Sequence, residues 1–271
     1  MWHTDNNKTR KTVRAAVWMT VAAAGLAGCS KTEAPHICPP AADHYVTLYI
    51  KPVDVFPAVM EKNTNGLNEA ETHRSDNVVL KVSFWPVSDR KILSVEQPSA
   101  EQAKNYVNRH AISSSPKSKR IYDSLSTAHG DTGFFEKADG RIGQEFYGMA
   151  VFRRMTLDVV SDADYDEAHP AGTSLVDILN LKARSAREII ESGYDIALCP
   201  QKYSPFGYQL DMPLAQFNGE YRKLVDGQFD LTFTALARTT AVHRFTVIYR
   251  DEDGRTISGI SNPVRLKGAQ D

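Results

Sequence analysis

The chain reads Phe229-Asp230-Leu231-Thr232-Phe233-Thr234 and, further on, Phe245-Thr246-Val247-Ile248-Tyr249-Arg250. Apolar side chains take every second position in the first stretch, and Phe245, Val247 and Tyr249 repeat this spacing in the second. Successive side chains of a strand point to opposite faces, so this period of two is typical of strands with one buried face. Asp253-Gly254 then supplies a hairpin turn before a last strand toward Leu266. The C-terminal quarter is therefore predicted to be antiparallel β-structure.

Similar alternation upstream predicts strands over 44–51, 78–85 and 149–161. The helical signals are short. Ser99 and Gln102 form a capping box that predicts a helix to about Ala111, a second helical stretch begins near Thr173, and another ends at Gly193. Five glycines between Gly130 and Gly148 predict an irregular loop.

The order of these elements predicts a mainly β protein, because strands dominate and no strand-helix-strand alternation occurs. We expect an antiparallel β-sandwich of immunoglobulin-like architecture with short inserted helices. The Cys…Trp…Cys spacing of true immunoglobulin domains is absent, so only the architecture is predicted.

The N-terminus has the layout of an export signal. Basic residues between Lys8 and Arg14 precede an apolar run of 13 residues, Ala15 to Ala27, which is short of the roughly 20 residues that a membrane-spanning helix needs. The run ends in Leu26-Ala27-Gly28-Cys29, which resembles the bacterial lipobox. This resemblance implies cleavage before Cys29 and lipidation of its thiol and its new amine. The alternative is an ordinary secretory signal whose cleavage site happens to precede a cysteine.

The expected organisation follows from this signal. Residues 1–28 form the signal peptide, residues 29–43 a tether rich in proline, alanine and charge, residues 44–148 a β-rich region with one helix, and residues 149–271 the C-terminal sandwich region. The last two regions could also form one continuous domain. Loss of the signal removes four basic and one acidic side chain, which changes the formal net charge from −1 to −4.

An acidic body argues against nucleic acid as a partner, since neutralising phosphates requires a clustered basic surface. The one basic cluster, Lys117, Lys119 and Arg120, lies among serines and is interpreted as a solvated loop.

Once Cys29 carries lipid, the remaining cysteines are the pair Cys38 and Cys199. A disulfide between them is the economical interpretation for an exported protein. Two buried free thiols are the alternative, and a metal site of Cys38 with His36 and His44 is a third one that no Cys-x-x-Cys spacing supports.

The best chemical candidate is the acidic cluster Asp162, Asp164 and Asp166, with Glu167 and His169 close by. Carboxylates at the first, third and fifth positions of a loop suit Ca²⁺, but the sixth and twelfth positions hold Glu167 and Thr173 instead of glycine and glutamate. An acidic, solvated turn between a strand and a helix is the other interpretation, and we expect no cofactor.

A second resemblance covers roughly residues 150 to 267. It is carried by the run Met155 to Asp166, by His169 to Leu175, by His243 to Val247, and by Asp253-Gly254 and Asn262-Pro263-Val264. In that order these residues are similar to a family of uncharacterised Bacteroidetes lipoproteins. No activity is known for this family, so the resemblance carries none over to this chain.

The expected function is a non-enzymatic one. The chain contains no Gly-x-Ser-x-Gly, no His-Glu-x-x-His and no Gly-x-x-x-x-Gly-Lys, and His243 is expected to be packed or exposed rather than catalytic. We expect a binding or assembly module of the cell envelope, anchored by lipid in the outer membrane, with an envelope protein or a surface ligand as its partner. The alternatives are a periplasm-facing structural partner of an outer-membrane complex and a hydrolase whose site is assembled from distant residues.

Overall fold

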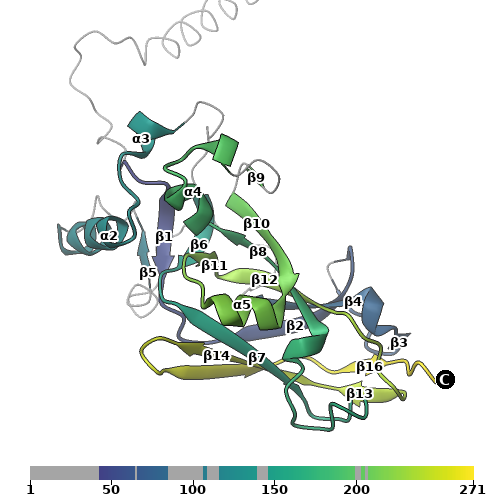
Figure 1. Ribbon diagram of the computed structural model, residues 1–271. Coiled ribbons are helices and arrows are strands. Elements are labelled where there is room, and N and C mark those ends of the chain that lie inside the picture. Colours follow the sequence, from purple (N-terminus) through teal and green to yellow (C-terminus); the bar gives the residue numbers. More distant parts are fainter. Residues whose placement is uncertain are drawn as a thin grey trace, which may run out of the picture. The chain divides into compact units, whose positions relative to one another are not determined.

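A mixed β-sheet of ten strands runs through the computed structural model of the protein (Figure 1). The structure describes residues 43–64, 66–84, 106–108, 116–138, 146–198, 203–204 and 207–271. All of them belong to the second of the two compact units of the chain, Ala42–Asp271.

Eight strands of the large sheet follow one another in space. Their order is β2 (Phe56–Glu61), β4 (Val78–Ser83), β12 (Gln228–Phe233), β8 (Leu179–Ser185), β11 (Val225–Asp226), β6 (Phe146–Val151), β1 (Val46–Ile50) and β5 (Tyr106–Asn108). Strand β10 (Gly207–Pro213) also pairs with β8, and β9 (Tyr203–Ser204) pairs with β10. The pairs are antiparallel except for β1 and β6, which run parallel.

Two sheets of three strands complete the β-structure. One has the order β15 (Thr256–Ile260), β14 (Phe245–Asp251) and β7 (Met155–Ser161), all antiparallel. The other has the order β13 (Ala241–His243), β16 (Val264–Leu266) and β3 (Thr72–His73), in which β16 and β3 are parallel.

The helices are short and lie between strands. The α-helices are α2 (Pro116–Ala128), α3 (Phe134–Lys137), α4 (Arg187–Glu191) and α5 (Leu214–Glu220), and the 3₁₀ turns are η1 (Ser75–Asn77), η4 (Val176–Ile178) and η5 (Ile196–Leu198). Gly193, with φ of 67°, follows α4 in the left-handed conformation that commonly ends a helix.

Alternation along the strands builds the core. In β7 every second side chain, Met155, Leu157, Val159 and Ser161, is buried. The main apolar cluster joins β7 and β14 to the inner faces of β2, β4, β8 and β12. A second cluster, rich in tyrosine, lies around β1, α2, α3 and α4.

The prediction of a mainly β protein with short helices is confirmed. The expectation of purely antiparallel sheets is wrong for the pairs β1/β6 and β16/β3, because side-chain alternation does not encode strand direction. Residues 44–148 and residues 149–271 both contribute strands to the large sheet.

Three local predictions are also corrected. Lys117, Lys119 and Arg120 lie on α2 rather than in a loop, and Tyr106–Asn108, expected in a helix, form the strand β5. The helical stretch expected from Thr173 amounts to the single turn η4. There Leu175 donates its backbone N–H to the Val159 carbonyl, and the chain enters strand β8 at once, so strand pairing outweighs the helical spacing.

Candidate functional site

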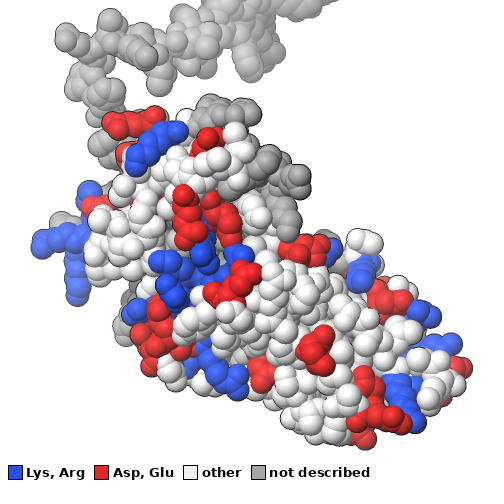
Figure 2. Space-filling model, in the orientation of Figure 1, with Lys and Arg blue, Asp and Glu red and all other residues white. Residues whose placement is uncertain are grey.

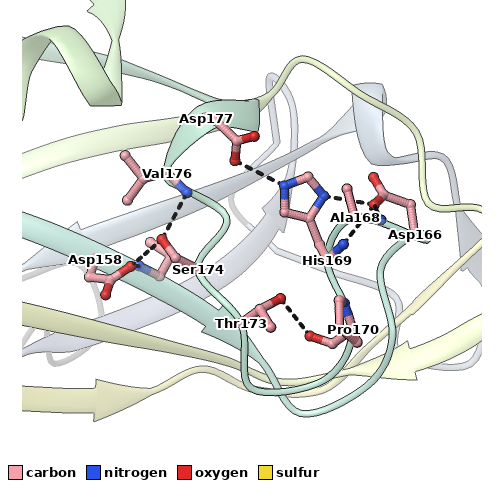
Figure 3. A network of polar contacts seen from close by, with 10 residues as sticks. Asp158, Asp166, Ala168, His169, Pro170, Thr173, Ser174, Val176 and Asp177 are labelled. Carbon is pink, nitrogen blue, oxygen red and sulfur yellow. Dashed lines mark hydrogen bonds and ion pairs between the residues drawn. The ribbon is translucent and has the colours of Figure 1, made fainter.

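The acidic cluster lies on the loop that connects β7 to η4. The loop leaves β7 after Ser161, turns at Asp166 and His169, and returns to pair Ser174 with Val160 through an isolated bridge. Figure 3 shows the polar contacts that hold this loop in shape.

His169 is the centre of these contacts. Its Nδ1 lies 2.7 Å from Asp166 Oδ1, and its Nε2 lies 2.9 Å from Asp177 Oδ1. The imidazole is buried, whereas the Asp177 side chain is exposed. The ring therefore bridges the turn at Asp166 to the 3₁₀ turn η4 (Figure 3).

The two carboxylates favour the charged imidazole. Burial by itself lowers the pKa of His169, but the hydrogen bonds and charges of Asp166 and Asp177 outweigh it, so the pKa is raised. Burial tends to raise the pKa of Asp166, yet His169 and the backbone N–H groups of Ala168 and His169 bring it below its usual value. Both carboxylates thus favour the imidazolium form of His169.

This geometry fits a role of His169 in holding the loop in shape better than a role as a catalytic base. A general base needs a free ring nitrogen within hydrogen-bond reach of its substrate, and both nitrogens of His169 already have partners. Ser174 donates its hydroxyl proton to Asp158 at 2.7 Å and accepts the backbone N–H of Val176 (Figure 3). The network orders the loop and fixes the start of β8.

The three aspartates of the candidate metal cluster each accept backbone N–H groups. Asp162 accepts the backbone N–H of Arg244, Asp164 accepts that of Ala171, and Asp166 accepts those of Ala168 and His169. Within the described ranges no group of three or more His, Cys, Asp or Glu side chains could hold a metal ion. Each of the three carboxylates caps backbone amides.

A serine and a histidine meet at the end of β7. Ser161 Oγ lies 2.9 Å from His243 Nδ1, and the ring of His243 stacks on Phe245 with 5.9 Å between the ring centroids. Both side chains are buried, burial lowers the pKa of His243, and its Nε2 has no hydrogen-bond partner among the described residues. An activated serine needs a base oriented by a third group and access for substrate, and this enclosed pair offers neither.

A buried carboxylate with four hydrogen-bond donors is one that sequence reasoning missed. Asp131, fully buried, accepts the backbone N–H groups of Tyr45 and Val46 at 2.7 and 2.9 Å and the hydroxyl protons of Tyr49 and Tyr194 at 3.1 and 2.9 Å. Burial raises the pKa of Asp131, and these hydrogen bonds offset part of the rise. The side chain ties the start of β1 to the turn between α2 and α3.

No family model, curated protein or solved structure matches the chain. The assignment of a function therefore depends on its own residues.

The predicted lipidation and disulfide residues, Cys29, Cys38 and Cys199, lie outside the described residues. Lipidation of Cys29 and the Cys38 to Cys199 bridge stay predictions. In the part of the chain that the structure describes, no helix has the length and apolar character that crossing a membrane requires.

Proposed function

We propose that the protein is a lipid-anchored, extracytoplasmic module that binds or assembles with other components of the cell envelope. The observation that carries the proposal is the sequence Leu26-Ala27-Gly28-Cys29 directly after a basic patch and a short apolar run. Several acyl chains on one cysteine are a sufficient anchor, because stable attachment needs more than one chain.

The polar side chains of the body support a role in binding rather than catalysis. His169 is enclosed by Asp166 and Asp177, Asp131 has four donors, and Ser161 and His243 are buried together. In each group these side chains form hydrogen bonds within the protein, and we infer that the bonds stabilise the fold. A folded body joined to a lipid anchor suits a module that presents a surface.

We further propose that the body is a β-sandwich in which the sheet of β15, β14 and β7 packs on the large sheet. Two contacts support this packing. Tyr249 of β14 lies edge-on to Phe84 with 5.1 Å between the ring centroids, and Gly259 of β15 lies so close to Val55 that an added Cβ would be 1.9 Å from the Val55 carbonyl oxygen. Two packed sheets would give the module a stiff frame.

Replacement of the anchor residue tests the proposed function. In the wild type, we expect intact mass measurement to find acyl chains on Cys29 and membrane fractionation to recover the protein with the envelope. Cys29→Ser should abolish acylation and release the protein, with Cys38→Ser as the matched control that keeps the anchor. An unacylated wild type, or a Cys29→Ser protein that stays in the membrane fraction, would contradict the proposal.

Protease added to intact cells distinguishes a module on the cell surface from one that faces the periplasm. Digestion of the body, with a periplasmic marker left intact, would place it on the cell surface. Protection would favour the alternative of a periplasm-facing partner of an outer-membrane complex.

A further inference from the structure

The chain joins the folded body at Asp43, and two helices gather at this place. The Asp43 carbonyl accepts the backbone N–H of Phe134 at 3.4 Å, and its carboxylate accepts that of Phe135 at 2.7 Å. Helix α2 packs on the first strand, where the Tyr122 hydroxyl donates to the Val46 carbonyl. In Figure 1, α2 and α3 lie beside β1 at one end of the body.

Large apolar side chains are exposed at this end. Phe135 on α3 is 55% exposed, Ile121 on α2 is 42% exposed, and Leu198 in η5 is 69% exposed. Tyr194, four residues before Leu198, packs on Phe134 of α3 with 5.4 Å between the ring centroids. Exposed apolar side chains on neighbouring elements are a common feature of interaction surfaces.

Basic side chains accompany them. Lys117, Arg120 and Ile121 are exposed at helical spacing on one side of α2, opposite the buried Tyr122, and Lys119 on its flank pairs with Asp123. Figure 2 shows the blue side chains of α2 projecting from this end of the body. The acidic groups close by are Asp43, Asp123 and Glu136, and Lys137 lies next to the last of these.

The proposed lipid anchor is close in sequence to this end of the body. Asp43 lies fourteen positions after Cys29, and a fully extended chain of that length spans at most about 50 Å. A short linker holds a tethered group at an effective concentration on the order of millimolar, so even a weak contact between the body and the membrane would be populated.

We propose that the exposed face of α2 and α3, formed by Lys117, Arg120, Ile121 and Phe135, docks on the phosphate-bearing surface of the bilayer that holds the Cys29 lipid. This inference rests on the proposed lipid anchor. The basic side chains pair with lipid phosphates, and the apolar side chains enter the boundary between headgroups and acyl chains. The opposite end, with β13 and β16, then points away from the membrane.

The test uses the full-length lipidated protein in vesicles of phosphatidylglycerol or of phosphatidylcholine that carry a headgroup quencher. A fluorescent amino acid replaces Ser124, exposed on the same helix, or Val242, exposed on β13 at the other end. In phosphatidylglycerol vesicles we expect quenching at position 124 to be at least threefold stronger than at position 242. High salt should weaken the quenching at position 124, because screening reduces the attraction between the basic side chains and the lipid phosphates.

Charge reversal provides the matched variants. Each basic side chain near an anionic surface changes partitioning by about fivefold, so Lys117→Glu with Arg120→Glu should reduce quenching at position 124 to the level at position 242. Arg244→Glu with Arg265→Glu, the same charge change on exposed residues at the other end, should leave it unaltered. Phe135→Ser should weaken quenching without abolishing its salt dependence.

Three outcomes would overturn the proposal: equal quenching at the two positions, no effect of the α2 charge reversal, or a dimer in detergent that Phe135→Ser dissociates, since a second copy would then cover this face. The intact mass of the same sample shows whether Cys29 is acylated. A missing acyl group therefore refutes the anchor, whereas an acylated protein without selective quenching refutes only the docking surface.

Discussion

Buried carboxylates in this protein act as acceptors for backbone N–H groups. Asp131 accepts two of them at the start of β1, and Asp226 accepts those of Met149 and Gln228 while it pairs with Arg184. Burial of a carboxylate raises the free energy of the folded protein unless donors form hydrogen bonds with it. Removal of the carboxylate is also unfavourable, because it leaves those buried donors without an acceptor.

Asp131→Ala should therefore destabilise the protein strongly. The variant leaves two backbone N–H groups and the hydroxyls of Tyr49 and Tyr194 without their acceptor, and we expect the free energy of unfolding to fall by about 3 kcal/mol. Urea unfolding followed by far-UV circular dichroism measures the change. Glu136→Ala, which removes an exposed carboxylate from α3, is the matched control and should have almost no effect.

The His169 bridge predicts a pH-dependent stability. The folded protein raises the pKa of His169, so the stabilisation is fully present below the pKa of unfolded histidine, about 6.5, and is lost as the pH rises through the folded pKa. The lowered pKa of Asp166 has the opposite sign, so its contribution is lost when the pH falls through the folded pKa of that carboxyl. The bridge is strongest between these two limits.

Comparison of the wild type with His169→Gln checks this. At pH 6 we expect the wild type to be more stable by about 1 kcal/mol, a modest value because Asp177 is exposed, and the difference should shrink at pH 9. Asp76→Asn, which breaks an exposed pair with Arg74, should show no such pH profile. A difference that grows toward pH 9 would show that His169 is not held as the cation.

Some of the residues that form the polar contacts could be predicted from the sequence, and others could not. Asp162, Asp164 and Asp166 stood out as an acidic run, but the run alone could not tell ligands from caps for backbone N–H groups, because the donors come from the fold. Asp131 was hidden because its partners lie up to 86 positions away. Asp177 looked like any other exposed aspartate.

At the scale of the element, regular alternation found some of the long strands with one buried face and missed others, among them β8 and β10. It predicted β7, β12 and β14 and the turn at Asp253-Gly254. It missed β3 and β11, which are two residues each and too short to show a period. Helical spacing misled at Leu175 because a few apolar residues before a strand fit both periods.

The contact between β15 and the chain before β2 predicts the effect of a single methyl group. An alanine Cβ at position 259 would lie 1.9 Å from the Val55 carbonyl oxygen, so Gly259→Ala must push the two segments apart. We expect a loss of about 3 kcal/mol and a melting temperature about 5 to 10 °C lower. Gly66→Ala is the matched control, because nothing lies within 4 Å of its added Cβ.

In the folded body as a whole, residues that are far apart in the sequence meet near Asp43. Asp43 and Tyr194 both contact Phe134, the first through a backbone hydrogen bond and the second through a ring contact, so these two distant positions lie near the same residue of α3. Each cysteine is five residues from this meeting point, a reach of up to about 17 Å.

The predicted Cys38 to Cys199 bridge has a measurable consequence. A bridge closing a loop of about 160 residues stabilises by at most about 5 kcal/mol, chiefly by restricting the unfolded chain. Cys38→Ser and Cys199→Ser should therefore lower the melting temperature by similar amounts, and the double variant by no more than either single one. Reductant should lower the melting temperature of the wild type and leave that of the double variant unaltered. Two reactive thiols in the unfolded wild type, or additive effects of the single variants, would show instead that both cysteines are free.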